Sequence, residues 1–172
     1  MKKISTLLLL FLLSSFIVSN AQTAEAKNTE ELTWYTDILK ANEISTATNK
    51  PLFAFFTGSD WCVWCKRLQA NVFAKPEFIK WAKENVVLVE LDFPRGKSLS
   101  PELTQQNNSL QQTFQVQGYP TVWMFFLHKK KDVEGYDIEA LGNLGYPQAE
   151  PGKEQFKFIS DGNALLKKRT AK

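Results

Sequence analysis

The two cysteines of this chain are the residues whose type and spacing carry the strongest chemical signal. Cys62 and Cys65 lie in the segment GSDWCVWCK, shortly after the apolar run LFAFF. A thiolate at such a site can attack a disulfide, and a second cysteine within reach can resolve the mixed disulfide that results. If a helix starts at Cys62, its free backbone N–H groups and its dipole favour the thiolate there. The pattern therefore predicts a redox pair.

Three other uses of a cysteine pair fit the sequence less well. Structural zinc needs about four ligands, whereas the chain has two cysteines and one histidine, His128, far along the sequence. Haem attachment requires a histidine directly after the second cysteine, where this chain has Lys66. A disulfide within this motif closes a very small loop, so its entropic stabilisation is small. We therefore predict no metal and no other cofactor.

The N-terminus has the pattern of a secretory signal peptide. Lys2 and Lys3 precede an apolar run at 7–18, and the small residues Ser19 and Ala21 follow it. The apolar run is short for a membrane span, and an uncleaved anchor is the alternative interpretation. We expect cleavage after Ala21 and export of the remaining chain.

These features divide the chain into three parts: a signal peptide at 1–21, a flexible leader at 22–33 and one domain at 34–170. The whole chain has 21 basic and 18 acidic residues. Loss of Lys2 and Lys3 with the signal peptide makes the two numbers nearly equal. Such a balance argues against a nucleic-acid partner. After cleavage no other stretch is long and apolar enough to predict a membrane partner. No spare dimerisation segment is visible, so we expect a monomer.

The hydrophobic pattern predicts an α/β domain. Short apolar runs predict buried strands at 52–56, 86–93 and 122–127, and a fourth strand at 133–141 after a tight turn at 129–132. Helical spacing predicts helices at 34–48, from Cys62, from Pro76, at 107–114 and at 154–168, the last with a break at 160–163. Residues 95–103 form a polar insert in this prediction. The order of elements is typical of a mixed central β-sheet flanked by helices.

Two segments resemble the signatures of the thioredoxin family. WCxxC after a buried strand and GYPT before another strand match them in order and spacing over roughly residues 34–166. The segments FFTGSDWCVWCK, PEF, VELDFP and QGYP resemble more specifically the DsbH-like oxidoreductases of this family. The resemblance implies a thioredoxin fold and a periplasmic thiol–disulfide oxidoreductase. It also implies exported, disulfide-containing proteins as substrates and a DsbD-like membrane reductase as electron donor.

The resemblance assigns roles to five residues of this chain. Cys62 is the attacking thiolate and Cys65 the resolving thiol. Pro120 is expected to be a cis-proline beside them, although a trans turn fits the local sequence as well. Tyr119 is expected to offer its backbone to an extended substrate segment, and Trp61 to pack at the rim of the groove.

The sequence departs from the thioredoxin pattern close to Cys65. Where thioredoxin has a buried aspartate, this chain has Phe55 and Phe56, and the lysine on the next strand is replaced by Glu90. Glu90 is either a proton acceptor for Cys65 or a carboxylate exposed at the end of a strand. Both interpretations stay open at the level of sequence.

The two residues between the cysteines bear on the direction of the chemistry. Val63 and Trp64 lack the histidine found in strongly oxidising relatives, and this favours a reductase. A disulfide isomerase or an oxidant of the same fold is an alternative. A thioredoxin-fold module that binds exported proteins without turnover is another, and the presence of both cysteines argues against it.

Overall fold

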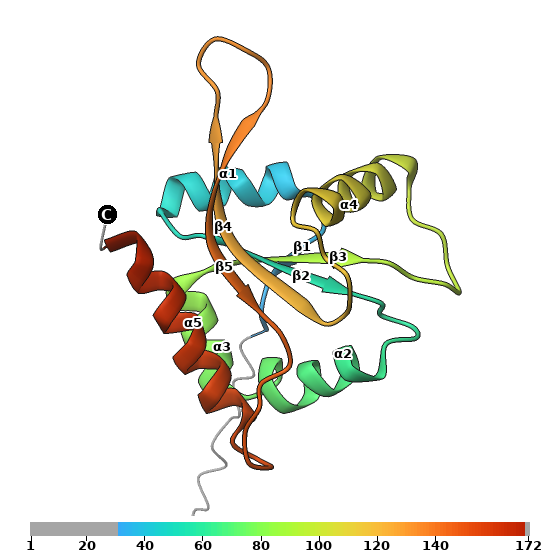
Figure 1. The fold of residues 1–172 in the computed structure, drawn as a ribbon, viewed down its shortest axis with the longest axis vertical. Helices are drawn as coiled ribbons and strands as arrows, with labels where there is room; N and C mark the ends of the chain where they lie inside the picture. Colours follow the sequence, from blue (N-terminus) through green and yellow to red (C-terminus); the bar gives the residue numbers. More distant parts are fainter. Residues whose placement is uncertain (1–30, 171–172) are drawn as a thin grey trace, which may run out of the picture.

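A five-stranded mixed sheet forms the centre of the computed structural model, which describes residues 31–170 (Figure 1). The strand order is β1-β3-β2-β4-β5. The strands are β1 (Trp34–Tyr35), β2 (Leu52–Thr57), β3 (Val87–Asp92), β4 (Thr121–Lys129) and β5 (Tyr136–Leu144). Strand β3 runs parallel to β1 and β2, whereas β4 is antiparallel to β2 and β5. The predicted signal peptide, and the predicted leader as far as residue 30, lie outside the described residues.

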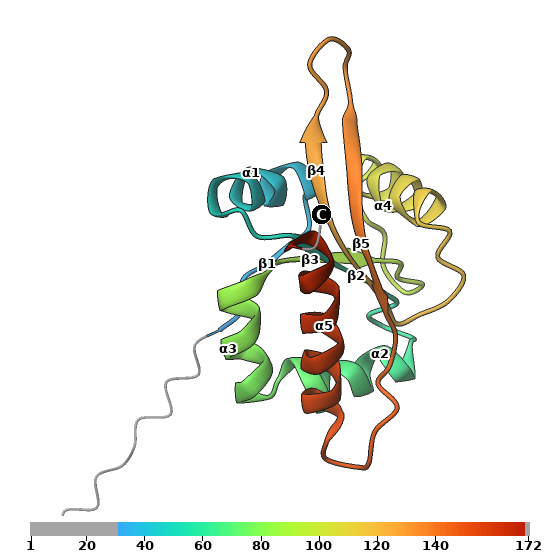
Figure 2. The same cartoon turned by 60° about the vertical axis from the view of Figure 1, so that its left-hand side comes forward.

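Helices cover both faces of the sheet (Figure 2). One face carries α1 (Ile38–Thr48) and α4 (Pro101–Thr113). The other carries α2 (Val63–Leu68) and its π-helical continuation η1 (Gln69–Phe73), together with α3 (Pro76–Asn85) and α5 (Glu154–Thr170). This arrangement confirms the α/β architecture and places the cysteine-bearing helix on the α3–α5 side.

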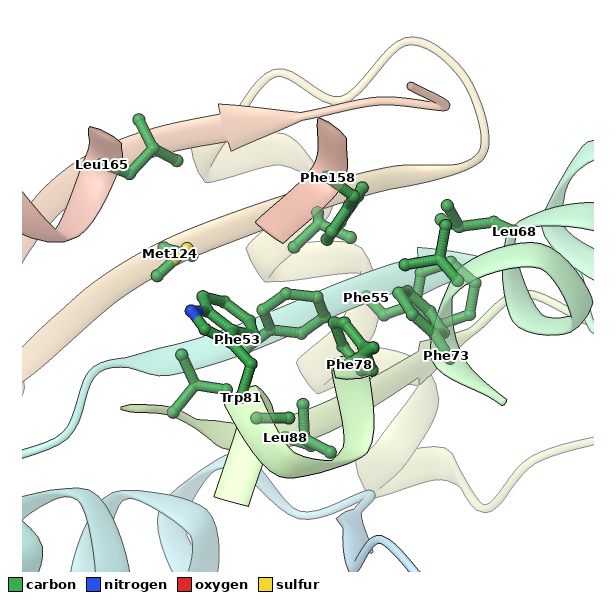
Figure 3. Close-up of a cluster of buried hydrophobic side chains, with 14 of the residues drawn as sticks. Phe53, Phe55, Leu68, Phe73, Phe78, Trp81, Leu88, Met124, Phe158 and Leu165 are labelled. Carbon is green, nitrogen blue, oxygen red and sulfur yellow. The ribbon is translucent and has the colours of Figure 1, made fainter. Parts of the chain in front are cut away.

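Strand β2 is buried along its whole length, as the run LFAFF predicts. Phe53 and Phe55 pack on the face that also holds both cysteines, whereas Phe56 packs on the α1 face. Phe53 is the centre of an aromatic cluster (Figure 3). The five ring centroids around it lie 5.8–6.4 Å away and belong to Trp34, Phe73, Phe78, Trp81 and Phe158.

The predicted starts of two helices were wrong, and in each case a capping residue explains the difference. Trp34 belongs to strand β1, because α1 begins only after Asp37, whose carboxylate accepts the N–H of Leu39 and Lys40. Helix α4 begins well before the predicted residue 107. Ser100 caps it, and Pro101 occupies the first turn, where its missing N–H costs nothing.

Two predictions near the C-terminus were also wrong. Strand β5 begins at Tyr136 rather than Val133, since the turn before it is longer than predicted and includes Gly135 at a φ of 126°. Helix α5 runs through residues 160–163 without a break. Gly162 lets the indole of Trp81 approach closely, because a Cβ there would lie 2.8 Å from the ring. The indole N–H of Trp81 donates to the side chain of Asn163 at 2.7 Å.

We expect Phe53→Ala to lower the free energy of unfolding by about 3–5 kcal/mol, because it leaves a cavity at the centre of the aromatic cluster. Chemical denaturation followed by far-UV circular dichroism measures the loss. Phe156→Ala is the matched control, since Phe156 is 47% exposed, and it should change stability by no more than about 0.5 kcal/mol. Equal losses in the two variants would contradict the central place of Phe53.

Candidate active site

Cys62 and Cys65 lie at the start of helix α2 and are joined by a disulfide. Cys62 is the N-cap, and its sulfur accepts the backbone N–H of Cys65 at 3.1 Å. Cys62 is 5% exposed and Cys65 only 1% exposed. The helix start therefore supplies a backbone donor to the Cys62 sulfur, which is the electrostatic setting that favours a thiolate.

The turn that presents Cys62 is tied to the end of strand β3 by a buried carboxylate. Asp92 is 6% exposed, and it accepts the backbone N–H of Ser59 at 2.8 Å and the Ser59 hydroxyl at 2.7 Å. The ammonium of Lys97 lies 3.2 Å from the same carboxylate. Three donors thus satisfy a charge that would otherwise be costly to bury.

A second carboxylate attaches the polar insert to the same turn. Asp60 accepts the backbone N–H groups of Gly96 and Arg95. These hydrogen bonds, that of Gly96 first, hold the pKa of Asp60 below its usual range. The insert predicted at 95–103 therefore lies against the active-site turn along its first residues.

Trp61 lies in the wall beside the cysteines, between the insert and the segment before β4. Its indole N–H donates to the Phe93 carbonyl at 2.8 Å, and the Arg95 guanidinium carbon lies 3.9 Å from its ring centroid. The ring of Tyr119 meets it edge-on at 5.8 Å. Gly58 makes this position possible, because a Cβ there would lie 2.3 Å from the indole.

Tyr119 and Pro120 approach the same site from the other side of β2. The peptide bond between them is cis. The Tyr119 ring stacks on Phe93 at 5.2 Å, and its hydroxyl accepts a hydrogen bond from Gln111 at 2.7 Å. Burial raises the pKa of Tyr119 to about 12, so the phenol stays neutral at physiological pH.

The residues between the cysteines are exposed and lie beside groups that the sequence did not reveal as neighbours. Val63 is 60% and Trp64 51% exposed. The Trp64 ring contacts Tyr146 at 5.1 Å and lies under the Arg67 guanidinium at 4.6 Å. Tyr146 follows β5 and is far from the motif in sequence, so only the fold brings it to the site.

Glu90 lies on the sheet face that carries the cysteines, paired in register with Phe55. It is half-buried at the wall of a cavity of about 510 Å³ that Phe55, Gln69 and Phe73 also line. Burial raises the pKa of Glu90, the nearby charge of Asp92 raises it further, and Lys97 opposes the rise. Within residues 31–170 no hydrogen bond joins Glu90 to either cysteine. Its part in proton transfer stays a prediction.

Two kinds of feature are absent from the part of the chain that the structure describes. No cluster of three or more potential metal ligands occurs there, and His128 instead pairs with Glu139 at 3.0 Å. None of the described helices has the length and apolarity that crossing a bilayer requires.

Comparisons with known proteins give matches in both sequence and structure. Residues 40–136 match the family model described as a thioredoxin-like domain. The disulfide bond reductase DsbH of Chlamydia pneumoniae is 34% identical over 130 residues, which cover 76% of this chain and 70% of that protein. The solved structure of a DsbH oxidoreductase, 29% identical, superposes with a TM-score of 0.68 and covers 86% of this chain and 93% of its own.

Two further relatives are longer proteins. The thioredoxin-related protein DsbJ of Chlamydia pneumoniae is 28% identical over 83% of this chain and 39% of its own length. The thiol:disulfide interchange protein DsbD of Haemophilus influenzae is 30% identical over 73% of this chain and 20% of its own length. A thioredoxin from Thermus thermophilus, at 16% identity and a TM-score of 0.53, shares the fold.

The similarity to the thioredoxin family predicted from WCxxC and GYPT is therefore confirmed, and so is the fold. The relatives carry the names of reductases and thioredoxin-related proteins, and this chain has the paired cysteines that thiol–disulfide exchange requires. The chain is a thiol–disulfide oxidoreductase, and it belongs to the thioredoxin-like family.

Proposed function

We propose that this protein is an exported reductase of protein disulfides. The observation that carries the proposal is the place of Cys62 at the start of α2, followed by Val63 and Trp64. The helix start favours the thiolate that attacks a disulfide. The two intervening side chains supply no cation, so the disulfide between Cys62 and Cys65 is not destabilised as it is in a strong oxidant.

The reaction would proceed in two exchanges. The Cys62 thiolate attacks one sulfur of a substrate disulfide, the substrate S–S bond breaks, and the leaving sulfur takes up a proton. Cys65 then loses its proton and attacks the Cys62 sulfur, which releases the second substrate thiol. Two electrons pass to the substrate, and the protein ends in the disulfide state that joins Cys62 to Cys65.

The residues around the cysteines support binding of an extended substrate segment. We assign Trp61, Tyr119 and Pro120 to this groove, with the backbone of Tyr119 pairing with the substrate in the manner of an added strand. The exposed side chains of Val63 and Trp64 offer apolar contact next to Cys62. Such contacts suit unfolded or loosely folded segments, in which apolar residues flank an accessible disulfide.

Export and an electron supply complete the proposal. The N-terminal pattern of Lys2, Lys3 and the apolar run at 7–18 supports a signal peptide, and the DsbH resemblance supports a periplasmic location. An oxidising compartment would keep the pair as a disulfide, so a reductase there needs a donor. A DsbD-like membrane reductase is the donor that the family resemblance implies.

We expect Cys62→Ser to reduce insulin disulfides no faster than dithiothreitol alone, because the attacking thiolate is lost. Cys65→Ser should accumulate mixed disulfides with substrates, because nothing resolves them. Turbidity of reduced insulin measures the first result, and mass spectrometry of the trapped complexes measures the second. Faster alkylation of Cys65 than of Cys62 at neutral pH would contradict these roles.

Glu90→Gln should slow resolution of the mixed disulfide by about tenfold or more, because the variant cannot accept the Cys65 proton. The first attack by Cys62 should be unchanged. Rapid mixing with a fluorescent disulfide peptide separates the two steps, and equal rates in variant and parent would remove Glu90 from the mechanism.

Stability gives a separate check on the burial of Glu90. A raised folded-state pKa means that burial disfavours the carboxylate, so the contribution of Glu90 to stability is lost as pH rises through that pKa. The Gln variant should therefore gain stability over the parent toward neutral pH and lose this advantage below the usual carboxyl range. This readout concerns the environment of Glu90 and is independent of the kinetic one.

The reduction potential tests the direction of the chemistry. Redox pairs of this fold span about −270 mV in thioredoxin to about −120 mV in DsbA, and we expect a value nearer the first. Equilibration with glutathione or dithiothreitol, followed by tryptophan fluorescence, measures it. Trp64→His places an ionisable donor between the cysteines and should raise the potential. A parental value near −120 mV would make the protein an oxidant.

A further inference from the structure

Thr57, the last residue of β2, is a buried polar residue that the fold leaves unsatisfied. Its exposed fraction is 0%, and its hydroxyl has no hydrogen-bond partner among the described residues. A hydroxyl without a partner is unfavourable in a protein interior, and native proteins keep few of them. The position of Thr57 therefore calls for a partner that the disulfide form of the protein does not provide.

Strand geometry places Thr57 on the face of the cysteines. Side chains alternate along a strand, so Thr57 shares a face with Phe53 and Phe55. These two phenylalanines belong to the buried cluster that contains Cys62 and Cys65. Thr57 is the member of this row closest to the active-site turn, because Gly58 follows it directly.

The neighbouring strands agree with this placement, and neither residue beside Thr57 is bonded to its hydroxyl. Thr57 pairs in register with Asp92, but the Asp92 carboxylate is engaged by Ser59 and Lys97. On its other side, the antiparallel register pairs Phe56 with Thr121, which sets Thr57 beside Pro120. Proline has no N–H to donate.

The two sulfurs of the active site differ in their hydrogen bonds. The Cys62 sulfur accepts the N–H of Cys65. The Cys65 sulfur, in a residue only 1% exposed, has no such donor within residues 31–170. A disulfide sulfur needs no partner. A buried thiol or thiolate at Cys65 is stabilised by a hydrogen-bond partner, and the unsatisfied hydroxyl of Thr57 on the same face can serve as one.

We propose that the hydroxyl of Thr57 is the hydrogen-bond partner of the Cys65 sulfur in the reduced protein. Reduction by a dithiol breaks the bond between the Cys62 and Cys65 sulfurs, adds two electrons and two protons, and converts the dithiol into a cyclic disulfide. The Thr57 hydroxyl can accept the new S–H of Cys65, and it can donate to the thiolate when that proton leaves. The inference rests on the redox role of the cysteine pair and is independent of the direction of turnover.

The proposal fixes the sign of the effect on the redox equilibrium. In the disulfide form the hydroxyl has no partner, which destabilises that form. In the reduced form the hydroxyl bonds to Cys65, which stabilises that form. Thr57 therefore shifts the equilibrium toward the dithiol, and its removal should shift it toward the disulfide.

The test compares Thr57→Val, which keeps the shape of the side chain, with Thr57→Ser, which keeps the hydroxyl. We expect the valine variant to shift the equilibrium with dithiothreitol toward the disulfide by about three- to tenfold, where tenfold corresponds to about 30 mV. The serine variant should stay within about twofold of the parent. An unchanged equilibrium in the valine variant, or an equal shift in both variants, would overturn the proposal.

The free energy of unfolding, measured separately for the oxidised and the reduced protein, distinguishes the proposed hydrogen bond from a role in packing alone. Thr57→Val should stabilise the oxidised protein, because it removes an unsatisfied hydroxyl, and should destabilise the reduced protein. Shifts of the same sign and size in both forms would show that Thr57 serves packing alone. The parental equilibrium constant tests the reductase proposal, whereas the ratio of variant to parent tests Thr57.

A second measurement keeps Thr57 in place, so it tests the proposed bond even if the valine variant does not fold. In Cys62→Ala the thiol of Cys65 is the only one in the chain, since the sequence has two cysteines, and alanine adds no hydroxyl that could accept its proton. Its infrared S–H stretch should lie below that of a free thiol if the hydroxyl accepts its proton. A stretch at the free-thiol frequency would contradict the proposed bond.

Discussion

The carboxylate of Asp92 is the group on which the geometry of the active site depends. It ends β3, and its hydrogen bonds to Ser59 hold the turn that leads into Cys62. This turn places Cys62 at the start of α2, where the backbone N–H of Cys65 donates a hydrogen bond to the Cys62 sulfur. Because Asp92 is buried, each of its bonds acts with little competition from water. Asp92 takes no part in the electron transfer itself, but its hydrogen bonds fix the turn that positions Cys62.

The sheet face beneath the cysteines changes from apolar to polar toward the active-site turn. Leu88, Phe53 and Met124 form one row across three strands, and Phe55 with Val122 lies in the next, beside Glu90. Thr57 lies in the last row, between Asp92 and Pro120. Where the thioredoxin pattern has a buried aspartate on this strand, the chain has Phe55 and Phe56. The chain instead has Glu90 beside Phe55 in the same row and Thr57 one row nearer the active-site turn.

The sequence predicted the parts of this arrangement that local pattern encodes. The apolar run of β2 and the cysteine spacing are local, and both were found where expected. Other contacts join segments that are distant along the chain, so no local pattern predicts them. Examples are the hydrogen bond from the Arg95 N–H to Asp60 and the contact of Trp64 with Tyr146. Glu90 stayed ambiguous for a related reason. In a strand buried on both faces, alternation of side chains does not reveal which face a single carboxylate shares.

The cations close to the cysteine motif interact with groups other than the Cys62 sulfur, in keeping with the reductase that we propose. Lys66 follows the motif, but its ammonium donates to the Asp60 carbonyl at 3.0 Å and is exposed. Arg95 lies over the Trp61 ring and is exposed as well, so water and salt screen its charge. The start of α2 supplies the hydrogen bond that the Cys62 sulfur accepts, from the N–H of Cys65. In the reductase that we propose, the balance between dithiol and disulfide therefore depends also on the groups beneath the buried sulfur of Cys65.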